Sequence, residues 1–225
     1  RAEEIVGRAI AGRREGLFIV SKVLPSNASY DGTRRACERS LRRLGIDCLD
    51  LYLLHWPGSH PIAETVRGLE SLVRDGMTER IGVSNFDVEE LRAARRASRN
   101  VPLACNQVLY HLGDRGIERR LIPYCRENGV TVMGYSPFGH GDFPKPSSQG
   151  GRVLADVAAR HGKTPRQVVL NFLTRDGVFA IPKSGDPTHV RENAGGEGWR
   201  LPDEDIAAVD RAFPAPDRDV PLGVI

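Results

Sequence analysis

Apolar residues recur along the chain in six short, nearly continuous runs, and a longer stretch with helical spacing follows each run. The runs predict strands at residues 17–23, 48–55, 80–85, 104–108, 130–136 and 178–184. The stretches that follow predict helices at residues 32–44, 62–74, 88–98, 117–127, 152–161, 165–174, 188–193 and 202–213. Strands that alternate with helices in this way are typical of an α/β fold with a parallel sheet covered on both faces.

The first twelve residues also carry a helical pattern, formed by Ile5, Val6, Ala9 and Ile10. A helix normally begins after a capping residue, and none precedes this pattern. We therefore expect the chain to begin inside a helix, with an N-terminal segment lying outside residues 1–225.

Two segments interrupt the alternation of strands and helices. Gly139–Gly151 is rich in Gly, Pro and Ser, and Ala194–Gly198 reads AGGEG. Both predict surface loops, and the first is long enough to form a lid over a site. Because no low-complexity linker divides the series, we expect residues 1–225 to form a single domain.

Composition narrows the class of protein. Hydrophobic residues make up 40% and charged residues 27% of the chain, and no apolar run approaches the roughly 18 residues of a membrane span. The 32 basic and 29 acidic residues are spread along the sequence, which gives a net charge of +3. We expect neither nucleic acid nor a membrane as a partner, although mild basicity suits a phosphorylated cofactor.

The cysteines give no sign of metal or disulfide chemistry. Cys37, Cys48, Cys105 and Cys125 lie far apart, without CxxC or Cys/His metal spacing, and no signal peptide precedes them. They predict reduced, buried thiols in a cytoplasmic protein without a metal site.

Polar residues stand at the carboxyl ends of the predicted strands. The pairs are Ser21-Lys22, His55-Trp56, Ser84-Asn85, Asn106-Gln107, Tyr135-Ser136 and Lys183-Ser184. Because ligands bind at the carboxyl ends of parallel strands, these residues predict a binding site on one face of the sheet.

Each of these residues also allows a structural explanation. Lys22 either extends to the surface or lies enclosed, where burial or a nearby carboxylate would tune proton transfer. His55 is either a hydrogen-bonded core histidine or a neutral imidazole that donates to a substrate carbonyl oxygen. Tyr135 is either part of the core or a flat surface on which a heteroaromatic ring stacks.

The same choice applies to the amide and hydroxyl side chains of Ser84, Asn85 and Gln107. They could cap the starts of helices, and Asn85 precedes the acidic sequence DVEEL as a cap would. Alternatively, they suit recognition of a carboxamide, which presents one donor and one acceptor in a plane.

Six strings of residues, each near a strand end, resemble the aldo/keto reductase superfamily in content and order. They are IVSKV, LDLYLLHWPG, IGVSNF, NQVLYH, GYSPFG and IPKSGDPTHVREN. The sequence is most similar to bacterial methylglyoxal-reductase-like members, judged by NQVLYHLGDRGIE, HVRENA and RAFPAP. The resemblance implies a (β/α)₈ TIM barrel whose first two strands are absent from this chain, which leaves six parallel strands.

The resemblance also implies catalytic residues. The family uses an Asp, a Tyr, a Lys and a His, and this sequence matches the lysine with Lys22 and the histidine with His55. The aspartate and the proton-donating tyrosine belong to an earlier segment of the family's sequence. Trp56 is implied in the substrate pocket, and Tyr52 or Tyr110 is the alternative proton donor if residues 1–225 are active alone.

The family's cofactor contacts are matched more fully. The implied residues are Ser84, Asn85 and Gln107 at the nicotinamide carboxamide, Tyr135 under the ring, Ser136, Phe138 and Gly139 at the pyrophosphate, and Lys183, Ser184, His189, Glu192 and Asn193 at the adenosine end. His189 occupies a position where the family often has an arginine, which would bind a 2′-phosphate more strongly. We therefore expect NADPH as cofactor, with NADH possible.

Together these residues predict an NAD(P)H-dependent enzyme that reduces small aldehydes or ketones to alcohols by hydride transfer. The resemblance also leaves open a cofactor-binding scaffold with weak turnover, or an inactive fragment of the enzyme. Retention of both Lys22 and His55 favours the enzyme, because a scaffold has no use for them.

Overall fold

A computed structural model describes residues 1–225, the whole chain. These residues fold into two compact units, Arg1–Asn106 and Gln107–Ile225. Six strands pair in chain order, from β1 to β6. The predicted α/β fold and the order of its strands are confirmed, whereas the expectation of a single domain stays a prediction.

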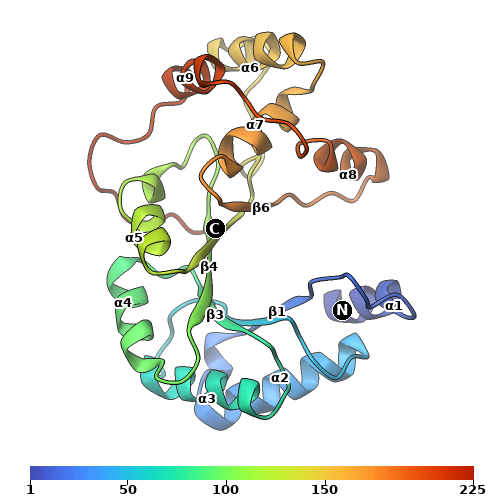
Figure 1. Cartoon of the computed structure of the whole chain (residues 1–225), viewed down its shortest axis with the longest axis vertical. Coiled ribbons are helices and arrows are strands. Elements are labelled where there is room, and N and C mark those ends of the chain that lie inside the picture. Colours follow the sequence, from blue (N-terminus) through green and yellow to red (C-terminus); the bar gives the residue numbers. More distant parts are fainter. The chain divides into compact units, whose positions relative to one another are not determined.

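The first unit repeats a strand followed by a helix (Figure 1). Its elements are α1 (Ala2–Ile10), β1 (Val20–Val23), the 3₁₀ turn η1 (Pro25–Asn27), α2 (Tyr30–Leu44), β2 (Leu51–Leu54), α3 (Ile62–Arg74), β3 (Ile81–Ser84), α4 (Val88–Ala97) and the first part of β4 (Leu103–Leu109). The pairs β1–β2 and β2–β3 are parallel, with Val20 opposite Leu51 and Tyr52 opposite Ile81.

Local signals explain where the helices of this unit begin and end. The Ser29 hydroxyl accepts a hydrogen bond from the Gly32 N–H at the start of α2, and Gly45 ends that helix with a φ of 66°. Asp87 and Glu90 form a capping box at the start of α4. All four residues of β2 and of β3 are buried, as the continuous apolar runs predict.

The second unit contains the rest of β4, the 3₁₀ turn η2 (Gly116–Glu118), α5 (Leu121–Glu127), β5 (Thr131–Tyr135), α6 (Gln149–Arg160), α7 (Pro165–Thr174), β6 (Phe179–Ile181), α8 (Pro187–Ala194) and α9 (Asp203–Ala212). Strand β5 pairs in parallel with β6 (Figure 1). Thr164 and Gln167 form a capping box at the start of α7, with Pro165 at its first position.

An ionic cluster surrounds the buried Arg115 side chain in the second unit. The Arg115 side chain is only 2% exposed, and its Nη2 lies 2.6 Å from a carboxylate oxygen of Glu118 and 2.6 Å from one of Asp210. Glu118 also pairs with Arg175 and accepts a hydrogen bond from the Tyr110 hydroxyl. Burial raises the pKa of Glu118, but hydrogen bonds from Arg115 and Tyr110 outweigh burial and hold it below its usual value.

Several predicted elements are too long. The helix predicted at 117–127 is divided into η2 and α5, because Pro123 fits only the first turn of a helix. The strand predicted at 17–23 begins at Val20, since the Ile19 N–H is held 2.5 Å from an Asp50 carboxylate oxygen. The strand predicted at 178–184 ends at Ile181, before Pro182, which has no N–H for a strand ladder.

Exposed apolar side chains occur at both edges of the sheet, in β6 and just before β1. In β6, Phe179 is 64% and Ile181 41% exposed. Before β1, Leu17 is 39% and Phe18 56% exposed. Such edges are what the expected absence of two neighbouring strands would leave, and that absence itself stays a prediction.

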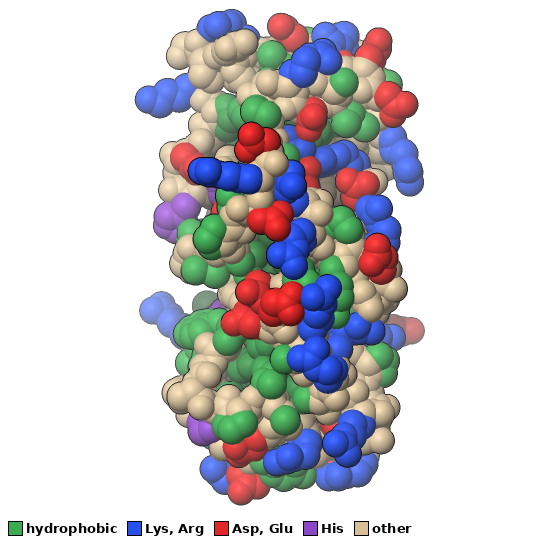
Figure 2. Space-filling view, turned by 90° about the vertical axis from the view of Figure 1, so that its left-hand side faces the viewer, with side chains coloured by type: hydrophobic (Ala, Val, Ile, Leu, Met, Phe, Trp, Pro, Cys, Tyr) green, Lys and Arg blue, Asp and Glu red, His purple; other side chains and the backbone are tan.

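The structure shows how the charged side chains are distributed and how deeply the cysteines are buried. Basic and acidic side chains are mixed over the face shown in Figure 2. No helix is both long enough and apolar enough to cross a membrane. All four cysteines are free, and Cys48 is half-buried while the other three are buried, so the expectation of four buried thiols is wrong at Cys48.

Candidate functional site

In the first unit, the ends of β1 and β2 bring Lys22 and His55 together. The His55 N–H continues the strand ladder by donating to the Val23 carbonyl at 3.0 Å. Both side chains are half-buried. A half-buried His55 does not fit the core explanation, whereas a half-buried Lys22 fits both of its explanations, so its role stays a prediction.

Their surroundings set the charge of both groups. Burial lowers the pKa of Lys22, and the nearby Cys105 thiol acts in the opposite direction. Burial, and then the charge of Lys22, lower the pKa of His55. At neutral pH His55 is consequently a neutral imidazole, and a neutral imidazole can donate a hydrogen bond to a carbonyl oxygen. The half-exposed Trp56 ring packs against the His55 ring, with 4.5 Å between centroids.

Ser84 and Asn85 follow at the end of β3. Asn85 Nδ2 donates to the His55 backbone carbonyl at 3.2 Å and to the Ser84 hydroxyl at 3.3 Å. Asn85 also has a φ of 58°, in the left-handed region that few residues other than glycine adopt. Of the two explanations of Asn85, the one in which it caps the next helix is wrong, because Asp87 performs that role.

In the second unit, Gln107 and Tyr135 lie on β4 and β5. Gln107 is only 4% exposed, and its Nε2 lies 2.8 Å from the Met133 sulfur. Tyr135 is half-buried rather than part of the core. Burial raises the pKa of Tyr135, although a hydrogen bond with the Ile225 backbone acts in the opposite direction.

The loop after β5 carries Ser136, Phe138 and Gly139. Ser136 has a φ of 52°, and it shares with Asn85 the rare combination of a positive φ and a side chain larger than glycine. The Gly139 N–H donates to the Ser136 carbonyl at 2.9 Å, which closes a tight turn. The expected loop 139–151 is shorter than predicted, because α6 begins at Gln149.

The predicted adenosine contacts gather on α8 and just before it. Lys183 and His189 are exposed, and the Ser184 hydroxyl accepts from the Asp186 N–H at 3.0 Å. Asn193 is 9% exposed, and its Oδ1 is buried without a hydrogen-bond partner. The Glu192 carbonyl accepts from Gln167 Nε2 of α7 at 2.8 Å.

The alternative proton donors do not fit that role. Tyr52 is fully buried, and burial raises its pKa. Tyr110 is 1% exposed, burial raises its pKa, and its hydroxyl donates to Glu118. Both tyrosines are therefore core residues of their units.

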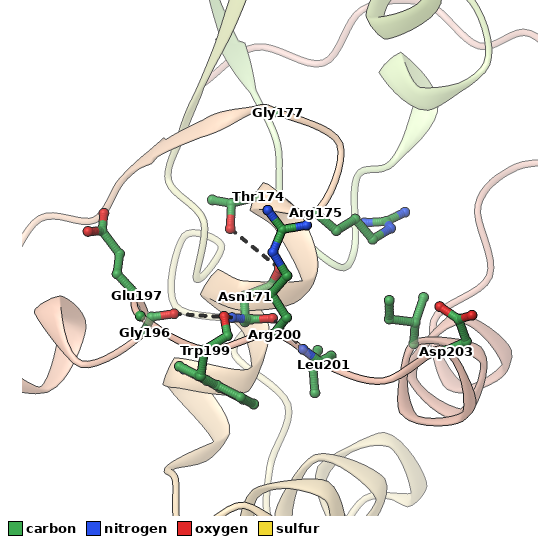
Figure 3. Close-up of a pocket in the computed structure, with 12 residues that line it drawn as sticks. Asn171, Thr174, Arg175, Gly177, Gly196, Glu197, Trp199, Arg200, Leu201 and Asp203 are labelled. Atoms are coloured by element: carbon green, nitrogen blue, oxygen red, sulfur yellow. Dashed lines mark hydrogen bonds between the residues drawn. The ribbon is translucent and has the colours of Figure 1, made fainter.

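A cavity of about 760 Å³ in the second unit contains none of the predicted site residues (Figure 3). Asn171 lies at its centre and holds the loop that begins at Gly195. Its Nδ2 donates to the Gly196 and Trp199 carbonyls at 3.3 and 2.8 Å, and its Oδ1 accepts from the Leu201 N–H at 2.9 Å. All three bonds join the Asn171 side chain to backbone atoms. Asn171 therefore holds the path of the loop beside this cavity.

Two features near the predicted cofactor residues leave no signal in the sequence pattern. Arg166 stacks on Phe138 and Phe143, and only a pairing of distant residues could have indicated this contact. The C-terminal segment also contacts this region, since the Ile225 backbone meets Tyr135 and Gly223 lies against Asp114. That segment has no periodicity from which its path could be predicted.

Comparison with known proteins identifies the family. The model of the aldo/keto reductase family matches residues 1–213. The methylglyoxal reductase YeaE of Escherichia coli is 41% identical over 225 residues, which are 100% of this chain and 79% of that protein. The glyoxal reductase of Bacillus subtilis is 38% identical over 91% of this chain and 73% of its own length.

Solved structures give the same result. An aldo-keto reductase from Klebsiella pneumoniae in complex with NADPH superposes with a TM-score of 0.91 at 42% identity, covering 100% of this chain and 79% of its own. Another Klebsiella pneumoniae structure, with NADP and acetate, gives a TM-score of 0.90 at 41% identity over 100% of this chain and 80% of its own. On the family match and the identity to these relatives, the chain belongs to the aldo/keto reductase family.

Proposed function

We propose that this chain forms most of an enzyme that binds NADPH and uses it to reduce aldehydes or ketones to alcohols. The observation that carries the proposal is the positive φ of Asn85 and Ser136. Each residue follows the last residue of a strand, and each matches a cofactor position of the family. Rare backbone conformations of this kind persist where the surrounding structure enforces them, often at ligand sites.

The side chains present fit a dinucleotide. Ser84, Asn85 and Gln107 would hold the carboxamide, Tyr135 would stack on the nicotinamide, and Ser136, Phe138 and Gly139 would surround the pyrophosphate. At the adenosine end, the unpartnered Oδ1 of Asn193 is an acceptor that an amino group could satisfy. Lys183, Ser184, His189 and Glu192 would complete that end, and the relatives solved with NADP or NADPH support the choice of cofactor.

The roles of the catalytic residues follow from their chemistry. When bound, NADPH supplies the hydride. His55 donates a hydrogen bond that orients and polarises the substrate carbonyl, and the half-exposed Trp56 beside it forms part of the substrate pocket. Lys22 lowers the pKa of the group that delivers the proton to the developing alkoxide.

We propose that this proton donor is a tyrosine at a family position that residues 1–225 do not include. Tyr52 and Tyr110 are too deeply buried to replace it. A polypeptide limited to residues 1–225 should therefore show little turnover, because loss of a positioned general acid costs about 10²- to 10⁴-fold in rate. In the same proposal, an eight-stranded (β/α)₈ barrel forms when two further strands join the six seen here.

The test is NADPH consumption with methylglyoxal and with an aromatic aldehyde. It would be measured for residues 1–225 and for a chain extended by the family's N-terminal segment, with NADPH binding followed by Trp fluorescence. The extended chain should bind and turn over, and the short chain should not turn over. Absence of NADPH binding by the extended chain would remove the proposal, and rapid turnover by the short chain would mean that another residue donates the proton.

A further inference from the structure

The Arg166 guanidinium lies in a corner formed by two aromatic rings. Its Cζ is 4.7 Å from the centroid of the Phe138 ring and 4.4 Å from that of Phe143. The two rings are nearly perpendicular, at 82°, with centroids 5.9 Å apart. One cation therefore contacts the two rings that bracket the loop after β5, and both contacts are within the range of cation–π attraction.

The position of Arg166 is fixed by the start of its helix. Pro165 occupies the first position of α7, and the capping box of Thr164 and Gln167 closes the first turn. Because Arg166 lies between these residues, its backbone is held at both sides. The helix thus presents the guanidinium from a rigid base.

The packing beneath the loop is incomplete. A cavity of about 90 Å³ has Phe138, Phe143, Val169 and Phe213 among its lining residues. Asp142 braces the turn only locally, through a 2.7 Å hydrogen bond from the His140 N–H. Contact with Arg166 is therefore one of the restraints that tie this loop to the rest of the unit.

The first turn of α7 also holds α8. Gln167 Nε2 donates to the Glu192 carbonyl, and a Cβ at Gly195 would lie 2.4 Å from that nitrogen. Consecutive residues of one turn thus attach to two segments that are far apart in the sequence. One segment carries the predicted pyrophosphate contacts and the other the predicted adenosine contacts.

We propose that Arg166 is a positioning residue that clamps the Phe138–Phe143 segment and thereby sets the rate at which the dinucleotide leaves. This inference rests on the proposed NADPH-binding function. With the guanidinium in place, the loop is held against α7, beside the residues that would surround the pyrophosphate. Without it, the two rings lose their shared cation and the loop opens into the space beneath them.

The test measures NADPH release by stopped-flow fluorescence, together with KM and kcat, in the active enzyme. Arg166→Leu should raise the release rate and the KM for NADPH about tenfold without lowering kcat, given the strength of two cation–π contacts. Arg166→Lys keeps the charge but not the planar group that contacts both rings. Its release rate and its KM for NADPH should therefore lie between those of the unmodified enzyme and those of Arg166→Leu. Arg211→Leu, an exposed arginine of α9, is the matched control and should leave all three values unchanged.

Hydrogen exchange of residues 136–144 without cofactor gives a second measurement. Exchange should be faster in Arg166→Leu than in the unmodified protein and the Arg211→Leu control, at an unchanged melting temperature of the whole protein. Unchanged exchange in Arg166→Leu, or faster exchange with unchanged NADPH release, would overturn the inference. If the unmodified enzyme does not bind NADPH, the proposed function fails and the role of the clamp in cofactor release fails with it. Should Arg166→Leu not fold, the Lys variant decides by the same criteria.

Discussion

The Asn85 side chain donates a hydrogen bond to the backbone carbonyl of His55 across 3.2 Å. A residue matched to cofactor binding therefore supports the strand end that carries His55, the proposed catalytic histidine. Because Asn85 also has a φ of 58°, its substitution affects both the hydrogen bond and the backbone conformation.

Two substitutions at Asn85 separate these effects. Asn85→Gly keeps the left-handed conformation and loses the hydrogen bond, so the free energy of unfolding should fall by about 1 kcal/mol. Asn85→Ala adds backbone strain and should cost about 1 kcal/mol more. Urea unfolding measures both, and an alanine variant as stable as the glycine variant would contradict the assigned conformation.

The Glu118 cluster predicts acid sensitivity. The folded-state pKa of Glu118 lies below its ordinary value of 4.5, so the folded state binds fewer protons than the unfolded state below that pH. The stabilisation is complete above pH 4.5 and is lost as the pH falls through the folded-state pKa.

Glu118→Gln should lower the free energy of unfolding at pH 7 by about 3 kcal/mol, because Arg115 loses one of its two carboxylates while it stays buried. The difference from the unmodified protein should shrink in acid. Denaturant unfolding at several pH values measures it, with Glu127→Gln on α5 as control. A constant difference down to pH 3 would be inconsistent with the cluster's role.

Lys22 should decrease stability at neutral pH. Burial lowers its folded-state pKa below 10.5, so between that lowered value and 10.5 the unfolded state binds more protons and stability rises with pH. Lys22→Met should therefore raise the free energy of unfolding at pH 7, with a smaller gain near pH 10. Lys145→Met, at an exposed lysine, should give no gain; equal effects of the two substitutions would argue against an enclosed Lys22.

His189 should limit the preference for NADPH. Replacing it by arginine supplies a permanent charge and paired donors for a 2′-phosphate, so His189→Arg should increase the ratio of NADPH to NADH affinity about tenfold. Titration with both cofactors measures the ratio. A proportional gain for NADH would show that His189 lies away from the phosphate.

Much of the fold could be predicted from the chain because its strands are continuously apolar. Runs such as LDLYLL can only be buried between layers, and β2 is indeed fully buried. The ends of helices and strands were harder to predict where a single residue determines them. Pro123 shortens α5, and the Asp50 carboxylate holds Ile19 outside β1.

Candidate site residues could be named from the sequence where they close a strand, because strand ends lie at one face in a parallel sheet; their roles stay predictions. Contacts between remote segments left no local pattern. In the sequence, nothing distinguishes Arg166 from an ordinary surface residue in the first turn of a helix. In the structure, it stacks on Phe138 and Phe143. Likewise, the sequence DVEEL favoured Asn85 as a cap, whereas the tertiary contact with His55 determines its conformation.

We propose that Lys22 acts on proton delivery in NADPH-dependent carbonyl reduction. Lys22→Met in the active enzyme is the most direct test of this role. Steady-state reduction of methylglyoxal and equilibrium NADPH binding would be measured on the same preparation. We expect kcat to fall at least about 100-fold while the Kd for NADPH changes less than about threefold, because the lysine acts on the proton step. Parallel losses in kcat and in NADPH affinity, or an unchanged kcat, would contradict the account.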